Sequence, residues 1–381
     1  MERKPVIVSV DWFRPAYLAG GPIASLENLF SLCQDDFHFH VVCSAMDLGK
    51  LPLANITQDT WITYSKNVRV YYRSHPNNSR RFWNSLLQEF PQATVYINGV
   101  FSWHYSLQPL WYCRGLGNII LVPRGMLGAN ALGIKKFKKK LVLSVFRLFG
   151  FYKNICIQCT NVNESIDTQK ALGCSPQQIQ IIPNVPRRIL PNPQKKYHPL
   201  KLCLIGRIHP VKNILGAIRI VKQLSSHAIP LDIYGPIEDS AYWNVCLQTI
   251  NNVPSIRYCG ELATDAIPDV LQSYSVFLLP SFGENFGHVI AEAIQAECAV
   301  LTGINTPWTW LNETGGGACL NPKNEAQFVE TLKAWKNLSE SDFSAFCKRG
   351  AAEFSKRFGL EDLKLKYRHL DRKSTRLNSS H

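Results

Sequence analysis

Short runs of β-branched and other apolar residues alternate along the chain with longer segments in which apolar residues recur every three or four positions. The first pattern is typical of buried strands and the second of amphipathic helices. In the first half the apolar runs are PVIVSV, FHFHVVC, VRVYY, ATVYIN, NIILVP, NICIQC and QIQIIP, with helical spacing around residues 22–33, 81–90, 104–114, 134–149 and 162–172. Such alternation predicts parallel sheets whose strands are joined by crossover helices.

A second series of strands follows a proline-rich break. Its runs are KLCLIG, PLDIYG, SIRYCG, SVFLLP and CAVLTG, whereas the break, residues 184–200, has four prolines and no periodicity. We therefore predict an N-terminal domain over residues 1–190 and a C-terminal domain over residues 200–354. A last helix, about residues 355–371, is a candidate to pack back on the N-terminal domain. Residues 372–381 resemble a sequencing-adaptor tail and are left out of the predictions.

Composition narrows the class of protein. A chain of 381 residues with 46% hydrophobic residues can bury the cores of two domains. The absence of a long apolar run or a cleavage site predicts a cytoplasmic protein. Twelve scattered cysteines, mostly in apolar runs, argue against a disulfide framework. The net charge of +14 favours an anionic partner, which includes nucleic acid, acidic lipid and phosphorylated ligands.

Two glutamates stand on either side of a predicted helix start in SFGENFGHVIAEA. Glu284 lies in the turn, and Glu292 lies in the helix, on the order of 10 Å further along its axis. The backbone amides of Phe286, Gly287 and His288 would lie at the helix N-terminus, where free donors and the helix dipole favour an anion. Carboxylates so spaced can accept hydrogen bonds from a different ring at each end of a diphosphate. The same spacing also fits two acids with no ligand.

Cationic residues follow another predicted strand, in LIGRIHPVKN. Arg207 and Lys212 would lie at the same carboxyl edge of the sheet as Glu284, the edge where open parallel sheets bind ligands. In the first half, Gly20 and Gly21 lie between the first strand and the first helix, where they can let a diphosphate approach helix amides. Taken singly, these features also fit surface charges and a plain turn.

In combination and in order, the motifs resemble the retaining glycosyltransferases of family 4, which have the GT-B fold. Residues 201–320 are similar to the nucleotide-binding domain through GRIHPVKN, ENFGHVIAEA and TGINTPWTWL, and the first half through GGPIASLENLF, PRGMLG and NVNES followed by IIPN. The resemblance implies an α/β protein of two Rossmann-like, doubly wound domains with parallel sheets facing a central cleft. It also implies transfer of a sugar from a nucleotide diphosphate-sugar to a glycan or lipid-linked acceptor with retention of anomeric configuration. The implied setting is bacterial exopolysaccharide, O-antigen or lipopolysaccharide biosynthesis.

The resemblance further implies roles for residues. Arg207 and Lys212 would neutralise the diphosphate and the charge that develops on it, which is electrostatic stabilisation of the transition state. Glu292 would bind the ribose, and Glu284 would contact the transferred sugar beside the helix-start amides. Many relatives carry a histidine where this chain has Arg124, so Arg124 is instead a candidate contact for phosphate or acceptor. No Asp-x-Asp element occurs, and we expect neither a metal nor a cofactor besides the donor.

Two alternative functions stay open. A nucleotide-sugar epimerase of the same fold, or a non-catalytic nucleotide-sugar binding protein, would use the same donor motifs.

The segment IKKFKKKLVLSVFRLF, residues 134–149, combines a basic cluster with apolar residues at Phe137, Leu141, Val145 and Leu148. This segment fits a helix that binds an anionic membrane, and the enzyme would then be a peripheral protein on the inner face of that membrane. It fits an ordinary domain helix equally well. Nucleic acid is a poorer fit, because the cations are not interleaved with aromatics as in known modules.

Overall fold

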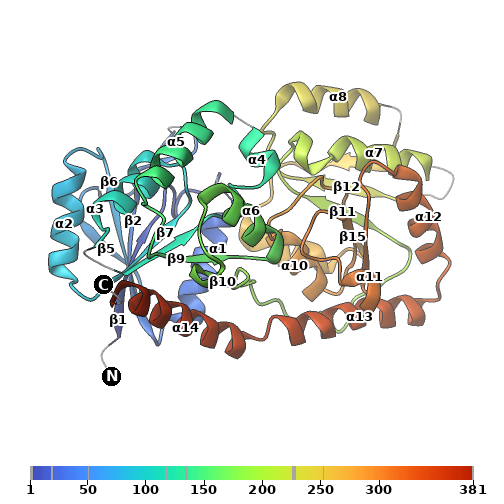
Figure 1. Ribbon diagram of the computed structural model, residues 1–381. Helices are drawn as coiled ribbons and strands as arrows, with labels where there is room; N and C mark the ends of the chain where they lie inside the picture. The colour runs from blue at the N-terminus through green and yellow to red at the C-terminus, as the bar shows by residue number, and fades with distance from the viewer. Residues whose placement is uncertain are drawn as a thin grey trace. The chain divides into compact units, whose positions relative to one another are not determined.

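The computed structural model describes residues 3–18, 20–49, 51–115, 118–133, 136–224, 229–251 and 253–379 (Figure 1). The chain divides into two compact units. Unit 1 comprises Met1–Val185 with Leu360–His381, and unit 2 comprises Pro186–Gly359. Each unit has one large sheet with helices on both of its faces.

The sheet of unit 1 has eight strands in the order β10-β9-β8-β7-β1-β2-β6-β5. Their bounds are β1 Lys4–Ser9, β2 Phe37–Ser44, β5 Trp61–Ser65, β6 Val68–Arg73, β7 Thr94–Asn98, β8 Asn118–Val122, β9 Cys156–Cys159 and β10 Ile179–Ile181. Each of the seven predicted apolar runs forms one of these strands, and their pairings are parallel. Since helices cover both faces, continuous apolar runs are what these strands require.

The strand β5 was not predicted. It pairs with β6 in the antiparallel sense at the edge of the sheet, and its side chains run from half-buried to exposed. An additional small sheet pairs β3 (Met46–Asp47) with β4 (Leu51–Pro52). Edge and hairpin strands bury little surface, so their apolar signal in sequence is weak.

Helices form two layers around the sheet of unit 1. The helices α1 (Gly21–Cys33) and α14 (Leu360–Ser379) pack on one face. The other face carries α2 (Ser79–Glu89), α3 (Gln108–Tyr112), α5 (Lys136–Leu148) and α6 (Val162–Leu172) (Figure 1). A π-helical turn, η1 (Trp103–Leu107), precedes α3, the short helix α4 (Ala129–Gly133) precedes α5, and a 3₁₀ turn, η2 (Pro176–Gln178), precedes β10.

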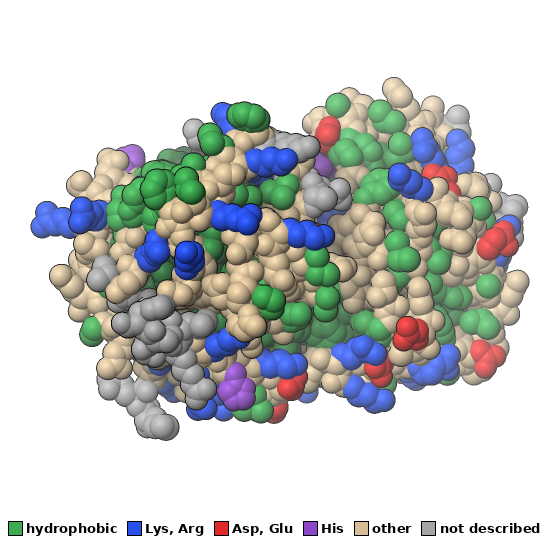
Figure 2. All heavy atoms as spheres, viewed as in Figure 1, with side chains coloured by type: hydrophobic (Ala, Val, Ile, Leu, Met, Phe, Trp, Pro, Cys, Tyr) green, Lys and Arg blue, Asp and Glu red, His purple; other side chains and the backbone are tan. Residues whose placement is uncertain are grey.

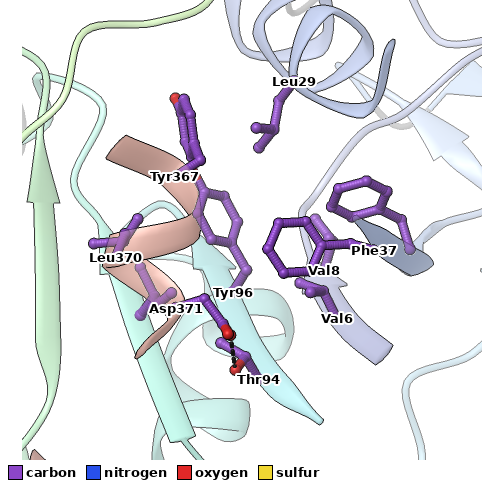
Figure 3. A pocket seen from close by; sticks show the side chains of 11 residues that line it. Val6, Val8, Leu29, Phe37, Thr94, Tyr96, Tyr367, Leu370 and Asp371 are labelled. Atoms are coloured by element: carbon purple, nitrogen blue, oxygen red, sulfur yellow. Dashed lines mark hydrogen bonds between the residues drawn. The ribbon is translucent and has the colours of Figure 1, made fainter. Parts of the chain in front are cut away.

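The last helix, α14, completes unit 1 although it follows unit 2 in the sequence. Lys4 Nζ donates to both carboxylate oxygens of Asp371 at 2.9 Å. Thr94 Oγ1 donates to Asp371 Oδ1 at 2.6 Å, as Figure 3 shows. Tyr367 and Leu370 are buried against the sheet, where they line a small, mainly apolar cavity of about 30 Å³. The helix continues into residues 372–379, part of the segment that was left out of the predictions; residues 380 and 381 lie outside the described ones.

The sheet of unit 2 has six parallel strands in the order β13-β12-β11-β14-β15-β16. Their bounds are β11 Leu202–Ile205, β12 Leu231–Tyr234, β13 Ile256–Tyr258, β14 Val276–Leu279, β15 Ala299–Gly303 and β16 Gly317–Leu320. Each of the first five lies within one of the predicted runs of the second half; β16 was not predicted.

The helices of unit 2 also form two layers. One layer contains α7 (Ile214–Gln223), α8 (Ser240–Ile250) and α12 (Glu325–Lys336). The other contains α9 (Ile267–Gln272), α10 (His288–Gln295), α11 (Leu311–Thr314) and α13 (Glu340–Arg357) (Figure 1). Two 3₁₀ turns, η3 (Pro210–Lys212) and η5 (Thr264–Ala266), lie before α7 and α9. The buried core of unit 2 is built from residues of unit 2 alone.

Among the described residues, no helix has both the length and the apolar character needed to cross a membrane. Within the same residues, no group of three or more His, Cys, Asp or Glu side chains is arranged to hold a metal ion.

Candidate functional site

The strand order of unit 2 reverses between β11 and β14. From β11 the chain moves to β12 and β13 on one side, and it then returns to β14, β15 and β16 on the other. Ligands of open α/β sheets bind outside the carboxyl ends of the strands at such a reversal. Lys212 follows β11 and Glu284 follows β14, and Lys212 Nζ donates to Glu284 Oε1 at 2.6 Å. Both side chains are largely buried, with 16% and 8% exposed.

Hydrogen bonds fasten the loops that carry this pair. Asn213, at a φ of 53°, starts α7: its Oδ1 accepts from the Gly216 amide at 3.2 Å, and its Nδ2 donates to the carbonyl oxygen of Pro280 at 3.0 Å. The Val211 carbonyl oxygen accepts from the Phe282 amide at 2.9 Å. The loops after β11 and β14 are thus held to each other, which fixes the position of the ion pair.

Arg207 lies at the same edge but contacts a different carboxylate. Its Nη1 donates to Glu238 Oε2 at 2.6 Å, and Glu238 belongs to the loop after β12. Both side chains are exposed, at 43% and 36%. A surface ion pair of this kind contributes only about 0–1 kcal/mol, so an anionic ligand can readily take Glu238's place. Glu238 was not predicted, because nothing in its local sequence distinguishes it from an ordinary loop acid.

The start of α10 offers free backbone donors beside Glu284. The N-cap is Gly287, at a φ of 77°, and no side chain caps the helix. Within the described residues, the amides of Phe286 and Gly287 donate no hydrogen bond. The positive φ at Gly287 favours glycine, and a Cβ there would lie 2.9 Å from Ile290 Cδ1, so the end of that side chain would have to shift. His288 is the first residue of the helix.

Phe286 contributes to this site through its backbone only. Its ring is buried and packs 5.3 Å, centroid to centroid, from the ring of Trp308. Trp308 Nε1 donates to the Phe286 carbonyl oxygen at 2.6 Å. The tryptophan therefore belongs to the core and stabilises the turn ahead of α10.

Glu292 lies in the middle of α10 and is only 5% exposed. Burial raises the pKa of this carboxyl from 4.5 to about 7, and the nearby charge of Arg187 offsets part of the rise. Within the described residues no hydrogen bond reaches the Glu292 side chain, whereas Arg187 donates to the Thr264 carbonyl oxygen and to Asp265. A buried carboxyl without a hydrogen bond leaves acceptor capacity for a ligand.

The predicted site residues of unit 1 come after its strands, at the carboxyl edge of its own sheet. Gly20 is the N-cap of α1, at φ 63° and ψ −114°, and Gly21 is the first residue of that helix. No side chain caps α1, and a Cβ on Gly20 would meet nothing within 4 Å. The backbone conformation is thus what requires glycine at position 20, and the space beside it is open.

Arg124 follows β8 and is held by neutral groups. Its Nε donates to Asn98 Oδ1 at 2.6 Å, its Nη1 to Ser25 Oγ at 2.8 Å and to Asn184 Oδ1, and its Nη2 lies 3.4 Å from the Tyr96 hydroxyl. No carboxylate of the described residues forms an ion pair with it. The guanidinium is therefore fixed in place with its charge uncompensated, which suits contact with an anion.

The apolar residues predicted on the segment 134–149 are exposed; residues 134 and 135 lie outside the described ones. We call Phe137, Leu141, Val145 and Leu148 the α5 stripe, whose members are 85%, 59%, 39% and 83% exposed, respectively. The helix meets the core through other residues, Leu143 and Phe146.

Figure 2 shows hydrophobic and basic side chains side by side over α5. Lys138 and Lys140 are exposed on the same helix. The stripe is thus an apolar surface with basic neighbours, and it is distinct from the face that packs on the domain.

The family model described as Glycosyl transferases group 1 matches residues 187–349, all within unit 2. A comparison with curated proteins finds no match.

The matches to solved structures extend over the residues of both units. HepE from Anabaena, in complex with UDP and glucose, has a TM-score of 0.72 at 13% identity, over 97% of this chain and 99% of that one. Sucrose-phosphate synthase from Thermosynechococcus elongatus has a TM-score of 0.73 at 14% identity, over 97% and 98%. A mutant of S. aureus TarM, in complex with fondaparinux, alpha-GlcNAc-glycerol and UDP, has a TM-score of 0.71 at 11% identity, over 97% and 99%.

The chain has the GT-B fold. The predicted α/β class with parallel sheets is therefore confirmed. Identities this low show a shared fold, whereas function has to be argued from the site.

Proposed function

We propose that the protein is a glycosyltransferase that moves a sugar from a nucleotide diphosphate-sugar to a hydroxyl of a glycan or lipid-linked acceptor. The observation that carries the proposal is the Lys212–Glu284 pair at the reversal of strand order, beside the uncapped start of α10. A cation, a carboxylate and free amides at one sheet edge suit a sugar joined to a diphosphate. The match of this segment to a glycosyltransferase family model supports the same reading.

In this proposal the residues of unit 2 divide the donor between them. Lys212 and Arg207 bind the diphosphate and stabilise the negative charge that grows on it as the sugar leaves. The amides of Phe286, Gly287 and His288 face the same charge, and Glu284 accepts hydrogen bonds from the transferred sugar. Glu292 accepts hydrogen bonds from the ribose. These cations and amides take the part that a metal ion plays in other enzymes, so the proposed reaction needs no metal or further cofactor.

The stereochemical part of the proposal is retention of the anomeric configuration. The acceptor hydroxyl would attack on the face from which the diphosphate departs, with no covalent intermediate on the protein, as the family 4 resemblance implies. Gly20, Gly21 and Arg124 at the carboxyl edge of unit 1 would contact the donor's phosphate or the acceptor. The proposed pathway is the synthesis of a bacterial exopolysaccharide, O-antigen or lipopolysaccharide.

A thermal-shift panel tests the donor class. A ligand that binds the native state raises the melting temperature by mass action. We expect a shift with one of the uridine, guanosine or adenosine diphosphate-sugars, and uridine is the first choice because the Anabaena and TarM structures contain UDP. No shift with any of them would contradict the proposal.

Labelled donor then separates three activities. A glycosyltransferase moves the labelled sugar onto a second molecule. A nucleotide-sugar epimerase returns a donor with altered sugar, and a non-catalytic binding protein shows a thermal shift without turnover. We expect transfer, with an α-linked product from an α-linked donor, because the proposed attack retains configuration.

We further propose that the protein works at the inner face of the cytoplasmic membrane. The exposed α5 stripe with its basic neighbours supports this, because apolar side chains can enter the headgroup region while lysines meet anionic lipid. Such contact would bring the enzyme to a lipid-linked acceptor.

A further inference from the structure

Unit 1 has a reversal of strand order of its own, and the residues there were not predicted. From β1 the chain moves to β2, β5 and β6 on one side, and it then returns to β7 on the other. The strands β1 and β7 are neighbours, with Val8 opposite Tyr96 and Ser9 opposite Ile97. The carboxyl ends of β1 and β7 are therefore where a ligand of this sheet is expected.

A carboxylate and a hydroxyl meet at that point. Asp11 follows β1 and Ser102 follows β7, and Ser102 Oγ donates to Asp11 Oδ1 at 2.5 Å. Ser102 Oγ also accepts from the Tyr105 amide at 3.3 Å, so its single proton is left for the aspartate. Within the described residues, Asp11 Oδ2 receives no hydrogen bond. One oxygen of the carboxylate is thus positioned by Ser102 and the other is unused.

The segment that carries Ser102 has an uncommon form. Ser102 caps the π-helical turn η1. Ser9 Oγ connects this turn to β1 by donating to the Tyr105 carbonyl oxygen at 2.7 Å. Turns of this kind are rare and frequently occur at functional sites. The first residue of the turn is Trp103, whose side chain is 52% exposed. A large aromatic ring thus faces solvent directly after the serine that holds Asp11.

The electrostatics of Asp11 favour a hydroxyl ligand. Burial raises the pKa of Asp11, while the Ser102 hydrogen bond and the charge of His104 lower it. A carboxylate that is partly removed from water forms stronger hydrogen bonds with a neutral donor than an exposed one does.

We propose that Asp11, Ser102 and Trp103 form a subsite of unit 1 for one sugar ring of the acceptor. Asp11 Oδ2 accepts a hydrogen bond from a ring hydroxyl, Ser102 holds the carboxylate in position, and the Trp103 ring offers an apolar surface to the C–H face of the sugar. A sugar presents both hydroxyls and apolar C–H groups, which this combination of carboxylate and exposed ring matches. The inference deepens the proposed glycosyl transfer and rests on it for the name acceptor.

Saturation-transfer NMR with the full-length protein and methyl glycosides of glucose, galactose and N-acetylglucosamine tests the subsite. We expect the wild-type protein to bind at least one of the three. Asp11→Asn and Trp103→Ala should each weaken that binding about ten-fold or more, because a hydrogen bond to a charged group or a ring contact is lost. The matched control is Asp59→Asn, which alters another aspartate of unit 1 that accepts a hydrogen bond from a serine, Ser74.

Two results would overturn the subsite: no binding of any glycoside by the wild-type protein, or unchanged binding in both Asp11→Asn and Trp103→Ala. Thermal shifts with nucleotide diphosphate-sugars, measured on the same proteins, report folding and donor binding separately. Asp11→Asn should keep the wild-type donor shift. Absence of that shift in the wild-type protein would instead contradict the proposed function, whatever the glycosides do.

Discussion

At the scale of single residues, Lys212 and Glu284 neutralise each other when no ligand is present. A diphosphate that approaches Lys212 therefore competes with a carboxylate 2.6 Å away. If Glu284 turns to the hydroxyls of the donor sugar, both members of the pair exchange one partner for another. The buried pair thus keeps the two groups positioned before the donor arrives, which lowers the cost of organising the site on binding.

Replacement of Lys212 by methionine should reduce the rate of sugar transfer about a hundred-fold or more, because a cation that stabilises the departing diphosphate is removed. The rate is measured with labelled donor, and the melting temperature is followed because Glu284 loses its partner. Lys222→Met, at an exposed position of α7, is the matched control. An unchanged rate in Lys212→Met would show that this lysine has no part in the reaction.

Glu292 should make the stability of the protein depend on pH. Its carboxyl titrates near 4.5 in the unfolded chain and near 7 in the native state, so the native state holds the proton more tightly. Its contribution to the free energy of unfolding is fully present below pH 4.5 and is lost as the pH rises through 7. Glu292→Gln has no such loss. Its free energy of unfolding, relative to that of the wild-type protein, should therefore rise by up to about 3 kcal/mol between pH 4.5 and pH 8.

Urea unfolding at pH 4.5 and pH 8 measures the difference between Glu292→Gln and the wild-type protein. The control is Glu313→Gln, an exposed glutamate for which that difference should be the same at both pH values. An equal difference for Glu292→Gln would mean that the native carboxyl titrates normally.

Some residues of the site could be predicted from the sequence and others could not. Lys212, Glu284 and the start of α10 follow apolar runs directly, so the topology of a parallel sheet brings them to one edge. The partners Glu238 and Asp11 also follow strands, but their contacts depend on loop conformations that no periodicity encodes. Contacts between side chains of different loops therefore could not be predicted from the sequence pattern.

At the scale of elements, α5 is a helix with two apolar faces. Leu143 and Phe146 bury one face in unit 1, and the α5 stripe leaves the other exposed. Exposed side chains such as Phe137 and Leu148 do not stabilise the folded domain. We therefore expect them to contact a partner surface.

Replacement of Phe137 and Leu148 together by serine should weaken binding to vesicles of phosphatidylglycerol about ten-fold or more, because two apolar side chains no longer leave water. Co-sedimentation measures the bound fraction, and vesicles of phosphatidylcholine should bind the wild-type protein less. Leu190→Ser with Leu247→Ser, at exposed apolar positions of unit 2, is the control pair. Equal binding by both double variants would argue against the membrane proposal.

The helix α14 is held to unit 1 by a buried charge. Asp371→Asn removes the ion pair with Lys4 and weakens the hydrogen bond from Thr94, so the free energy of unfolding should fall by about 3 kcal/mol. Urea unfolding measures the loss. Asp362→Asn breaks only an exposed pair with Lys366 on the same helix and should cost less than about 1 kcal/mol. A similar small loss for Asp371→Asn would mean that the contact contributes little.

Elements with strong periodicity were predicted well, whereas those with weak burial were not. The strand β2 is mostly apolar and almost wholly buried because both of its faces are covered. The edge strand β5, WITYS, has residues typical of strands but was missed because it is short, half exposed and not a continuous apolar run.

At the scale of the whole molecule, each unit repeats one arrangement: a mostly parallel sheet whose strand order reverses, with polar residues at the reversal. Unit 2 also has a core of its own, drawn only from residues 189–358. Unit 1 differs, because Tyr367 and Leu370 of α14 belong to its core. The two units should therefore respond differently to separation.

Residues 186–359 expressed alone should fold and keep the donor-dependent thermal shift, because the core and the proposed donor site both lie inside this range. Circular dichroism follows folding, and the nucleotide-sugar panel follows binding. Residues 1–185 alone should instead aggregate, since the sheet face under α14 is left bare. A folded unit 2 without any donor shift would show that residues of unit 1 are needed for binding.

The chain order of α14 has a consequence for synthesis on the ribosome. At roughly 5–20 residues per second, the interval from Val185 to Leu360 lasts on the order of ten seconds or more. Throughout that delay Leu29, Phe37 and their neighbours lack the cover that α14 later supplies. The unit translated first is thus the one finished last, and a nascent chain that stalls before Leu360 would present an adhesive surface to chaperones and proteases.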